Sequence, residues 1–318
     1  MATIKAERET AKMLAEKFAS GDKALIKEAS ADIDRFIRRQ FTEQSFMDKI
    51  LEPETIGAED LYQSLKDDKL YVLLELEPDL PAVGSYAFNG ASPMVTMGLK
   101  RVLVSLHQIM SVRMKKNVHE LLTHVVSLRD LNADYLLKQV LRHFDGCGLA
   151  CIQRGIGQSP GQVMKTTGSV HWHEIHDGFT PAALGESFKI IRRLGAENGL
   201  QSQTLLMNMV THAEIAKWPG GLTIGNELTT DIMKNGLGTF ESSSMGLKFV
   251  VTIKRKLVPD GAVYHFGDPK YIGHTYVWRE PTLHVDQMAD SVSFYVDAFR
   301  GGAIFFFAGL ARVDHTQV

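Results

Sequence analysis

Apolar residues recur at helical spacing between Asn117 and Arg154 and predict the longest helical stretch of the chain. Asn117 and Glu120 have the spacing of a capping box, so we expect a helix to begin there. The pattern restarts near Asn132, which predicts a short helix followed by a long one, and Gly155 is the expected left-handed stop. At ~1.5 Å per residue the long helix covers ~30 Å, the width of a small domain.

Small residues occupy the second half of this predicted helix. Gly146 and Gly148 each cost about 1 kcal/mol relative to alanine inside a helix, so we expect another segment to pass close to them. The two cysteines of the chain, Cys147 and Cys151, are predicted to be buried small residues in a reducing compartment rather than a disulfide or a metal pair. Asp145 is predicted to be a local hydrogen-bond acceptor rather than an acid catalyst.

Two stretches before this helix alternate between apolar and polar residues, which predicts strands over residues 69–77 and 101–114. The second would extend ~45 Å at ~3.3 Å per residue, with Met110 and Val112 on its apolar side and Ser111 on its polar side. The proline- and glycine-rich segment between them is too long for a hairpin turn. We therefore expect a two-stranded arm, which is barely stable alone and so lies on a neighbouring molecule.

The first 49 residues read as helix, with two apolar stripes separated at Ser20-Gly21. Basic and acidic residues interleave on the other faces, a pattern typical of a solvated surface with helical ion pairs. The basic pair Arg38-Arg39 is a weak candidate for nucleic-acid contact. The mixed charge of this N-terminus is not that of a signal peptide.

A shorter α/β stretch follows the long helix. Thr180 is predicted to cap a helix that opens at the next residue, a proline, and closes at Asn198-Gly199. A strand is expected over Thr204–Met209. Thr211 and Glu214 have the spacing of a second capping box and predict a further helix there.

The last third of the chain is predicted to be mostly strand. Strands are expected over Leu247–Val258 and Ala262–Phe266, joined by a Pro-Asp-Gly turn. Residues 291–300 alternate and are expected to end at Gly301-Gly302. The apolar run Ala303–Leu310 is predicted to be a strand buried on both faces.

Composition limits the function classes. The chain has 318 residues, of which 44% are hydrophobic, enough for one large core or two modest ones. A net charge of -2 gives no general nucleic-acid signal, because such proteins usually carry a basic domain or stripe. No apolar run approaches the ~18 residues of a membrane span.

The segment from His171 to His176 holds the one metal-like cluster of the sequence. His171 and His173 would share a face on a strand and could bind zinc, with His176 nearby, but no third ligand can be named and the spacing alone is permissive. Ordinary polar strand or loop residues are the favoured interpretation. Gly155-Ile156-Gly157 follows a helix, unlike a dinucleotide fingerprint. No catalytic, cofactor-binding or metal residue is therefore predicted.

Read in order, these segments resemble the major capsid proteins of tailed bacteriophages, whose Hong Kong ninety-seven-type fold is shared with herpesvirus shells and encapsulins. The resemblance covers roughly residues 60–313 and is strongest in the last third, where a strand, a Val-Pro-x-Gly turn, a glycine-bearing hairpin and two closing strands follow one another. These features are Leu257–Ala262, Gly267-Asp268-Pro269, Ile272-Gly273, Ser291–Arg300, Gly301–Ile304 and Ala308–Val313.

The resemblance implies an α+β fold and a division of the chain into the parts of that fold. They are an N-terminal helical arm over residues 1–68, an extended two-stranded E-loop over 69–114, a peripheral domain with a long spine helix over 115–159, an axial domain over 160–278, and the return strands of the peripheral domain over 279–318.

The function that the resemblance implies is that of a viral structural protein. Identical subunits would form the hexamers and pentamers of an icosahedral shell around double-stranded DNA, held without sequence specificity. Portal, scaffolding and cement proteins are possible partners, with scaffolding supplied by a separate protein or by none. No enzyme activity, cofactor or membrane contact is implied, and the location is the virion, after assembly in the host cytoplasm.

Three alternatives stay open at this point. One is an ordinary α+β binding protein, which would be a monomer or a small oligomer. An encapsulin-like nanocompartment has the same fold but encloses an enzyme cargo. A metal-dependent enzyme using His171, His173 and His176 would bind zinc and lose activity on His173→Ala, whereas a shell protein would assemble unchanged.

Overall fold

The computed structural model describes most of the chain after residue 44. The described residues are 45–63, 69–76, 100–117, 136–165, 167–194, 201–217, 239–242, 247–288 and 291–316. The predicted helices before residue 45, the tip of the predicted arm, and the predicted helical stretch from 118 to 135 lie outside this part of the chain.

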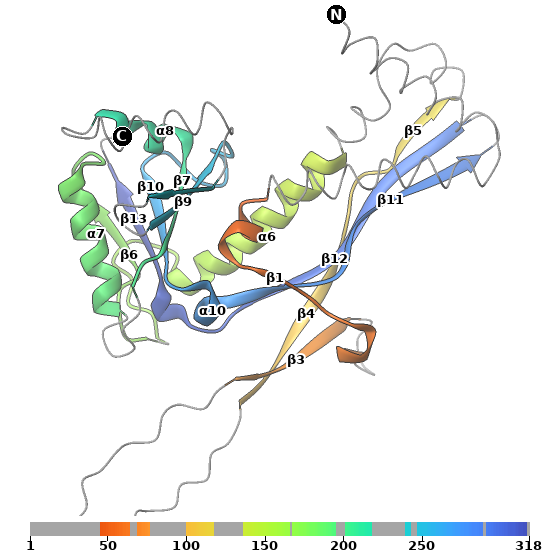
Figure 1. Cartoon of the computed structure of the whole chain (residues 1–318), viewed down its shortest axis with the longest axis horizontal. Helices are drawn as coiled ribbons and strands as arrows, with labels where there is room; N and C mark the ends of the chain where they lie inside the picture. The colour runs from red at the N-terminus through yellow and green to blue at the C-terminus, as the bar shows by residue number, and fades with distance from the viewer. Residues whose placement is uncertain are drawn as a thin grey trace, which may run out of the picture.

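A seven-stranded sheet runs obliquely across Figure 1, with the order β1-β11-β12-β4-β3-β2 and with β5 also paired to β12. Its longest pairing is the antiparallel pair β11 and β12, and all its pairings are antiparallel except that of β1 with β11. The strands are β1 (Pro53–Thr55), β2 (Leu61–Gln63), β3 (Leu70–Leu76), β4 (Lys100–Met110), β5 (Met114–Asn117), β11 (Gly273–Met288) and β12 (Ser291–Ile304).

A six-stranded sheet lies at the opposite end of the molecule, with the order β6-β13-β10-β7-β9-β8 (Figure 1). Every residue of its central strands β7 and β10 is buried, and a separate apolar cluster joins it to α7. The elements here are β6 (Trp172–Ile175), α7 (Pro181–Leu194), β7 (Thr204–Asn208), α8 (Met209–Ala213), η3 (Glu214–Lys217), β8 (Thr239–Ser242), β9 (Leu247–Thr252), β10 (Ala262–Phe266) and β13 (Leu310–His315).

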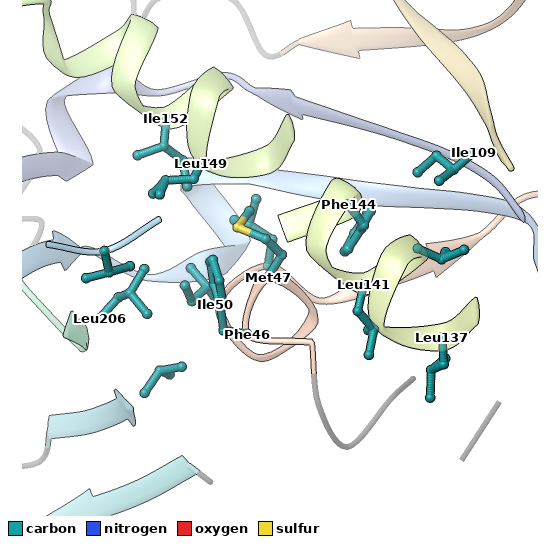
Figure 2. Packing of buried hydrophobic residues seen from close by; sticks show 14 of the residues in the cluster. Phe46, Met47, Ile50, Ile109, Leu137, Leu141, Phe144, Leu149, Ile152 and Leu206 are labelled. Carbon is teal, nitrogen blue, oxygen red and sulfur yellow. The ribbon is translucent and has the colours of Figure 1, made fainter. Parts of the chain in front are cut away.

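Helix α6 (Lys138–Ile156) runs between the two sheets and buries one face in the largest apolar cluster. The short helix α3 (Met47–Ile50) packs on it, and Figure 2 shows Met47 and Ile50 close to Leu149 of α6. Two further one-turn helices, α10 (Pro269–Ile272) and η4 (Phe307–Gly309), and the turn η1 (Ala58–Asp60) connect strands.

The predicted strand over residues 101–114 is wrong in its second half. β4 ends at Met110 and β5 begins at Met114, and Met110 and Val112 are exposed while Ser111 is buried. The buried side of the strand changes because its partner changes: β4 pairs with β3 through Leu106 and with β12 from His107 onward. Val104 and Leu106 are buried before the change, and Ile109 and Ser111 are buried after it. Ser111 follows the end of β4 on the same partner, since its backbone N–H donates to Val296 O and its Oγ accepts from Val296 N, both at 2.8 Å.

The predicted strand end at Gly301-Gly302 is also wrong, since β12 continues through both glycines to Ile304. A Cβ added at Gly301 would lie 2.6 Å from Ser105 O, so glycine lets β4 approach β12 closely here. The apolar run Ala303–Leu310 is not the predicted strand, because η4 interrupts it before β13.

The predicted helix start at Asn117 is wrong, because this residue closes β5. The predicted restart near Asn132 lies outside the described residues. The predicted stop at Gly155 is wrong, because Gly155 lies inside α6, whose C-cap is Gly157 with φ 121°. The predicted close approach is confirmed at Gly148, where an added Cβ would lie 2.7 Å from Met47 Cε. Gly155 shows a second close approach, at 2.4 Å from Phe307 Cδ1.

Around the smaller sheet the predicted start of α7 is confirmed, because Thr180 Oγ1 accepts from Ala183 N at 3.2 Å. Its predicted end at Asn198-Gly199 lies outside the described residues. The capping box at Thr211 is wrong: Asn208 caps α8 by accepting from Thr211 N at 2.8 Å. The strand expected over Leu247–Val258 stops at Thr252, while β10 has its predicted bounds.

β11 was not predicted, and the residue 278 boundary expected between domains falls inside it. β13 belongs to the six-stranded sheet, although residues 279–318 were expected to return to the other part of the molecule.

Candidate assembly surface

We use the name arm for β3 together with the part of β4 that pairs with it, residues 70–76 and 100–106. Figure 1 shows the arm projecting away from α6 and from the six-stranded sheet. A small apolar cluster supports its base, and it is separate from the cores of α6 and of the six-stranded sheet. The buried members of this cluster are Ile56, Val72, Val104, Leu106 and Tyr276.

The apolar residues of the arm continue beyond this cluster. Along one face of β4 toward the arm's tip, the exposed fraction rises from 4% at Leu106 and 5% at Val104 to 37% at Val102. On the other face Leu103 is 60% exposed. An apolar side chain gains about 25 cal/mol for each Å² removed from water, so this outer part of the arm is apolar surface that the protomer itself does not bury.

Close packing fixes the base of the arm to the long hairpin of β11 and β12. Gly301 lies against the backbone of Ser105, and the rings of Trp278 and Phe299 meet edge to face with centroids 4.9 Å apart. Burial raises the pKa of Tyr276, beneath the arm, to about 12. The arm is therefore held in a defined direction where it leaves the body.

The segment from Ser45 to Leu51 is held to α6 by a buried carboxylate. Asp145 accepts hydrogen bonds from Ser45 Oγ at 3.0 Å and from Met47 N at 3.3 Å, and it forms an ion pair with Lys254. Its predicted role as a hydrogen-bond acceptor is confirmed. Burial raises the pKa of the Asp145 carboxyl, and Lys254 opposes that rise.

A second buried ion pair ties the same segment to β12. Arg300 Nη1 donates to both carboxylate oxygens of Asp48, at 2.8 and 2.9 Å, and its guanidinium lies 4.8 Å from the Phe144 ring centroid. Burial raises the pKa of Asp48, while Arg300 lowers it. Removing one partner of such a pair leaves an uncompensated buried charge, so these two pairs fix the position of the segment from Ser45 to Leu51.

The histidines singled out in the sequence are placed as polar strand and loop residues. His171 is buried, with Nδ1 2.8 Å from Leu310 O and Nε2 2.6 Å from Thr167 Oγ1, and burial lowers its pKa. His173 Nε2 lies 2.9 Å from Val170 O, and His176 is exposed. No group of three His, Cys, Asp or Glu side chains suited to a metal occurs in the part of the chain that the structure describes.

Both cysteines are exposed in the protomer, so the prediction of buried thiols is wrong. The helical register explains this, because α6 buries Phe144, Asp145, Leu149 and Ile152 on the opposite face.

Three buried histidines were missed. His212, His265 and His315 each have a ring nitrogen without a hydrogen-bond partner among the described residues. Burial lowers the pKa of His212 to about 4 and that of His265 to about 3. Only the apolar residues on both sides of His265 in the strand Ala262–Phe266 could have indicated that this histidine is buried.

None of the helices that the structure describes is both long and apolar enough to cross a membrane.

Comparison with known proteins finds likeness in structure but not in sequence. No protein-family model matches the chain, and no curated protein matches it. The structure is similar to that of Mycobacterium phage Bobi, with 13% identity and a TM-score of 0.57 over 87% of this chain and 92% of that one. The capsid of the Cyanophage P-SCSP1u gives 9% identity and a TM-score of 0.56 over 87% and 89% of the two chains.

A virus-like particle from Pyrococcus furiosus is also similar, at 10% identity and a TM-score of 0.50, over 90% of this chain and all of that one. Identities this low carry information about fold alone. The likeness spans 87–90% of this chain and 89–100% of those three chains. The chain therefore has the mixed helix-and-sheet fold of phage capsid proteins, as its sequence predicted.

Proposed function

We propose that the protein is the major capsid subunit of a tailed bacteriophage, assembling into hexamers and pentamers of an icosahedral shell that encloses double-stranded DNA. The observation that supports this most directly is the arm, whose apolar residues Val102 and Leu103 extend past the core of their own protomer. A second copy is the proposed cover for them.

The arm is a two-stranded hairpin that extends beyond the core of its own protomer. A two-stranded hairpin is marginally stable in water unless another surface packs on it. When every copy offers an arm and every copy receives one, the contact is heterologous, and heterologous contacts close into rings and shells. In this proposal α6 and the seven-stranded sheet form the peripheral domain and the six-stranded sheet forms the axial domain.

The proposal extends to location and partners. The subunit assembles in the host cytoplasm and resides in the virion, where portal, scaffolding and cement proteins are candidate partners. Its action is structural, in keeping with the capsid proteins that share its fold. On this account His173→Ala leaves assembly unchanged, whereas a zinc enzyme would lose activity.

A second candidate, an encapsulin-like compartment, is favoured by the likeness to the virus-like particle from Pyrococcus furiosus over the whole of that chain. The contents of the shell separate the two candidates. One encloses DNA, and the other encloses protein cargo.

The test is negative-stain microscopy of the purified protein, followed by nuclease treatment of particles from the native source and measurement of protected nucleic acid. We expect closed shells that protect double-stranded DNA. Closed shells with protein cargo and no nucleic acid would support the compartment, and a monodisperse small oligomer would contradict both.

A further inference from the structure

One exposed pair of side chains on α6 has the spacing and the separation of metal ligands. His143 and Cys147 lie one helical turn apart, where side chains of an α-helix are neighbours on one face. Both are exposed, and Cys147 Sγ lies 3.5 Å from His143 Nε2. Neither residue takes part in the arm, in the ion pairs of Asp48 and Asp145, or in the buried core.

The separation of the two atoms matches the edge of a metal tetrahedron. Zinc binds thiolate sulfur at ~2.3 Å and imidazole nitrogen at ~2.0 Å, which puts two tetrahedral ligands about 3.5 Å apart. Without a metal, the same contact is a hydrogen bond between the Cys147 thiol and the His143 ring nitrogen. Two ligands four residues apart on one helix face are also how helical zinc sites are built.

We propose that His143 and Cys147 form a two-ligand site for a thiophilic divalent cation such as zinc, with water in the remaining positions. Imidazole and thiolate bind such ions in preference to hard cations such as magnesium. Binding releases the thiol proton to solvent, and the ion takes its place between the two atoms. The site is independent of the proposed shell function, since it needs only a folded α6.

Cys151 supplies the competing arrangement. It lies one turn beyond Cys147 on the same exposed face, close enough for the two thiols to interact electrostatically. A dithiolate site would use Cys147 with Cys151 and would not need the imidazole. The two arrangements share Cys147 and differ in the second ligand, so variants of His143 and Cys151 distinguish them.

The test uses cadmium ion alone as a probe of the purified, natively assembled protein. Its sulfur-to-metal charge-transfer absorption counts thiolate ligands directly, and protection of Cys147 from alkylation, read by mass spectrometry, gives a second measurement. We expect one cadmium per subunit, loss of the band in Cys147→Ser, and at least a tenfold weaker apparent affinity in His143→Ala.

Two variants serve as controls. Cys151→Ser keeps both proposed ligands, and His176→Ala removes an exposed histidine elsewhere, so both should titrate like the unaltered protein. Loss of binding in Cys151→Ser with retention in His143→Ala would overturn the proposal in favour of the dithiolate. Absence of the charge-transfer band from the unaltered protein would overturn it as well.

Discussion

The six-stranded sheet and the arm are both built from alternating or continuous apolar strands, but they differ in where that apolar surface goes. In β7 and β10 every residue is buried within the protomer. In the arm the buried residues of β4 end at Val104, while the side chains of Leu103 and Val102 are 60% and 37% exposed. The difference teaches that the protomer buries the apolar surface of one region itself and leaves that of the other exposed, where the proposed function places a second copy.

The two regions should therefore respond differently to acid, and this is the largest difference we expect. His265 and His212 have pKa values of about 3 and about 4 in the folded protein, below the 6.5 of an exposed imidazole. Their neutral forms contribute stability that is fully present above pH 6.5 and is lost as the pH falls toward 4. The loss is on the order of 1.4 kcal/mol per pH unit for each histidine.

Hydrogen exchange at pH 7 and pH 5, corrected for the intrinsic pH effect, should show β10 losing protection before β11 and β12 do. His265→Leu should reduce that loss, while His107→Leu, at an exposed site on β4, should not. Equal loss of protection in all three strands would break the comparison.

Truncation in the self-contained region comes next in size. Phe266→Ala should lower the free energy of unfolding by about 3–5 kcal/mol, because Phe266 fills the core and leaves a cavity there. Chemical denaturation measures the change. The matched truncation in the arm, Leu103→Ala, should change the same quantity by less than about 0.5 kcal/mol in the unassembled protein.

Removal of the cation that faces Asp145 should cost about 3 kcal/mol, because it leaves a buried carboxylate without its ion pair. Lys254→Ala makes this change. Lys256→Ala, two residues away and exposed, is the control and should be neutral within error. Equal denaturation midpoints for the two variants would mean that the pair does not anchor the segment at Ser45.

Two glycines of α6 should respond to alanine in opposite directions. Gly155→Ala forces a methyl group against the Phe307 ring and should cost about 1–3 kcal/mol. Gly146 has its nearest neighbour, Leu257 Cδ2, at an ordinary 3.7 Å, so Gly146→Ala should stabilise the protein by up to about 1 kcal/mol through helix propensity. Thermal unfolding of the pair tests whether close packing or propensity governs this helix.

Sequence patterns predicted the elements whose signals are local. β10 has its expected bounds because a Pro-Asp-Gly turn and a Gly-Asp-Pro turn enclose it, and α7 begins where Thr180 and Pro181 predict. The expected pairing of the two strands of the arm is confirmed by β3 and β4. The fold class followed from the order of such elements, which does not depend on exact bounds.

The errors arose where a distant segment decides the local structure. β4 changes partner from β3 to β12 after Leu106, so the buried side of the strand switches from Val104 and Leu106 to Ile109 and Ser111. Gly301 stays in its strand because β4 passes against it, and Cys147 is exposed because the core lies on the other face of α6. β11 was missed because Arg279, Glu280 and Pro281 interrupt its pattern, at the place where its register with β12 also shifts.

One substitution in the arm, Leu103→Asp, should have the smallest effect on folding of the protomer and the largest effect on assembly. Leu103→Asp puts a charge on the exposed face of the arm and should leave the protomer folded. A buried, unpaired carboxylate is costly, so a partner surface should no longer accept the arm. Val163→Asp is the matched control, since Val163 is 59% exposed but lies outside the arm.

Sedimentation velocity of the unaltered protein and these two variants tests the central claim most directly. We predict shell-sized particles for the unaltered protein and for Val163→Asp, and folded, slowly sedimenting subunits for Leu103→Asp. Shell-sized particles from Leu103→Asp, equal in amount to those of the control, would contradict the account of the arm as the contact between copies.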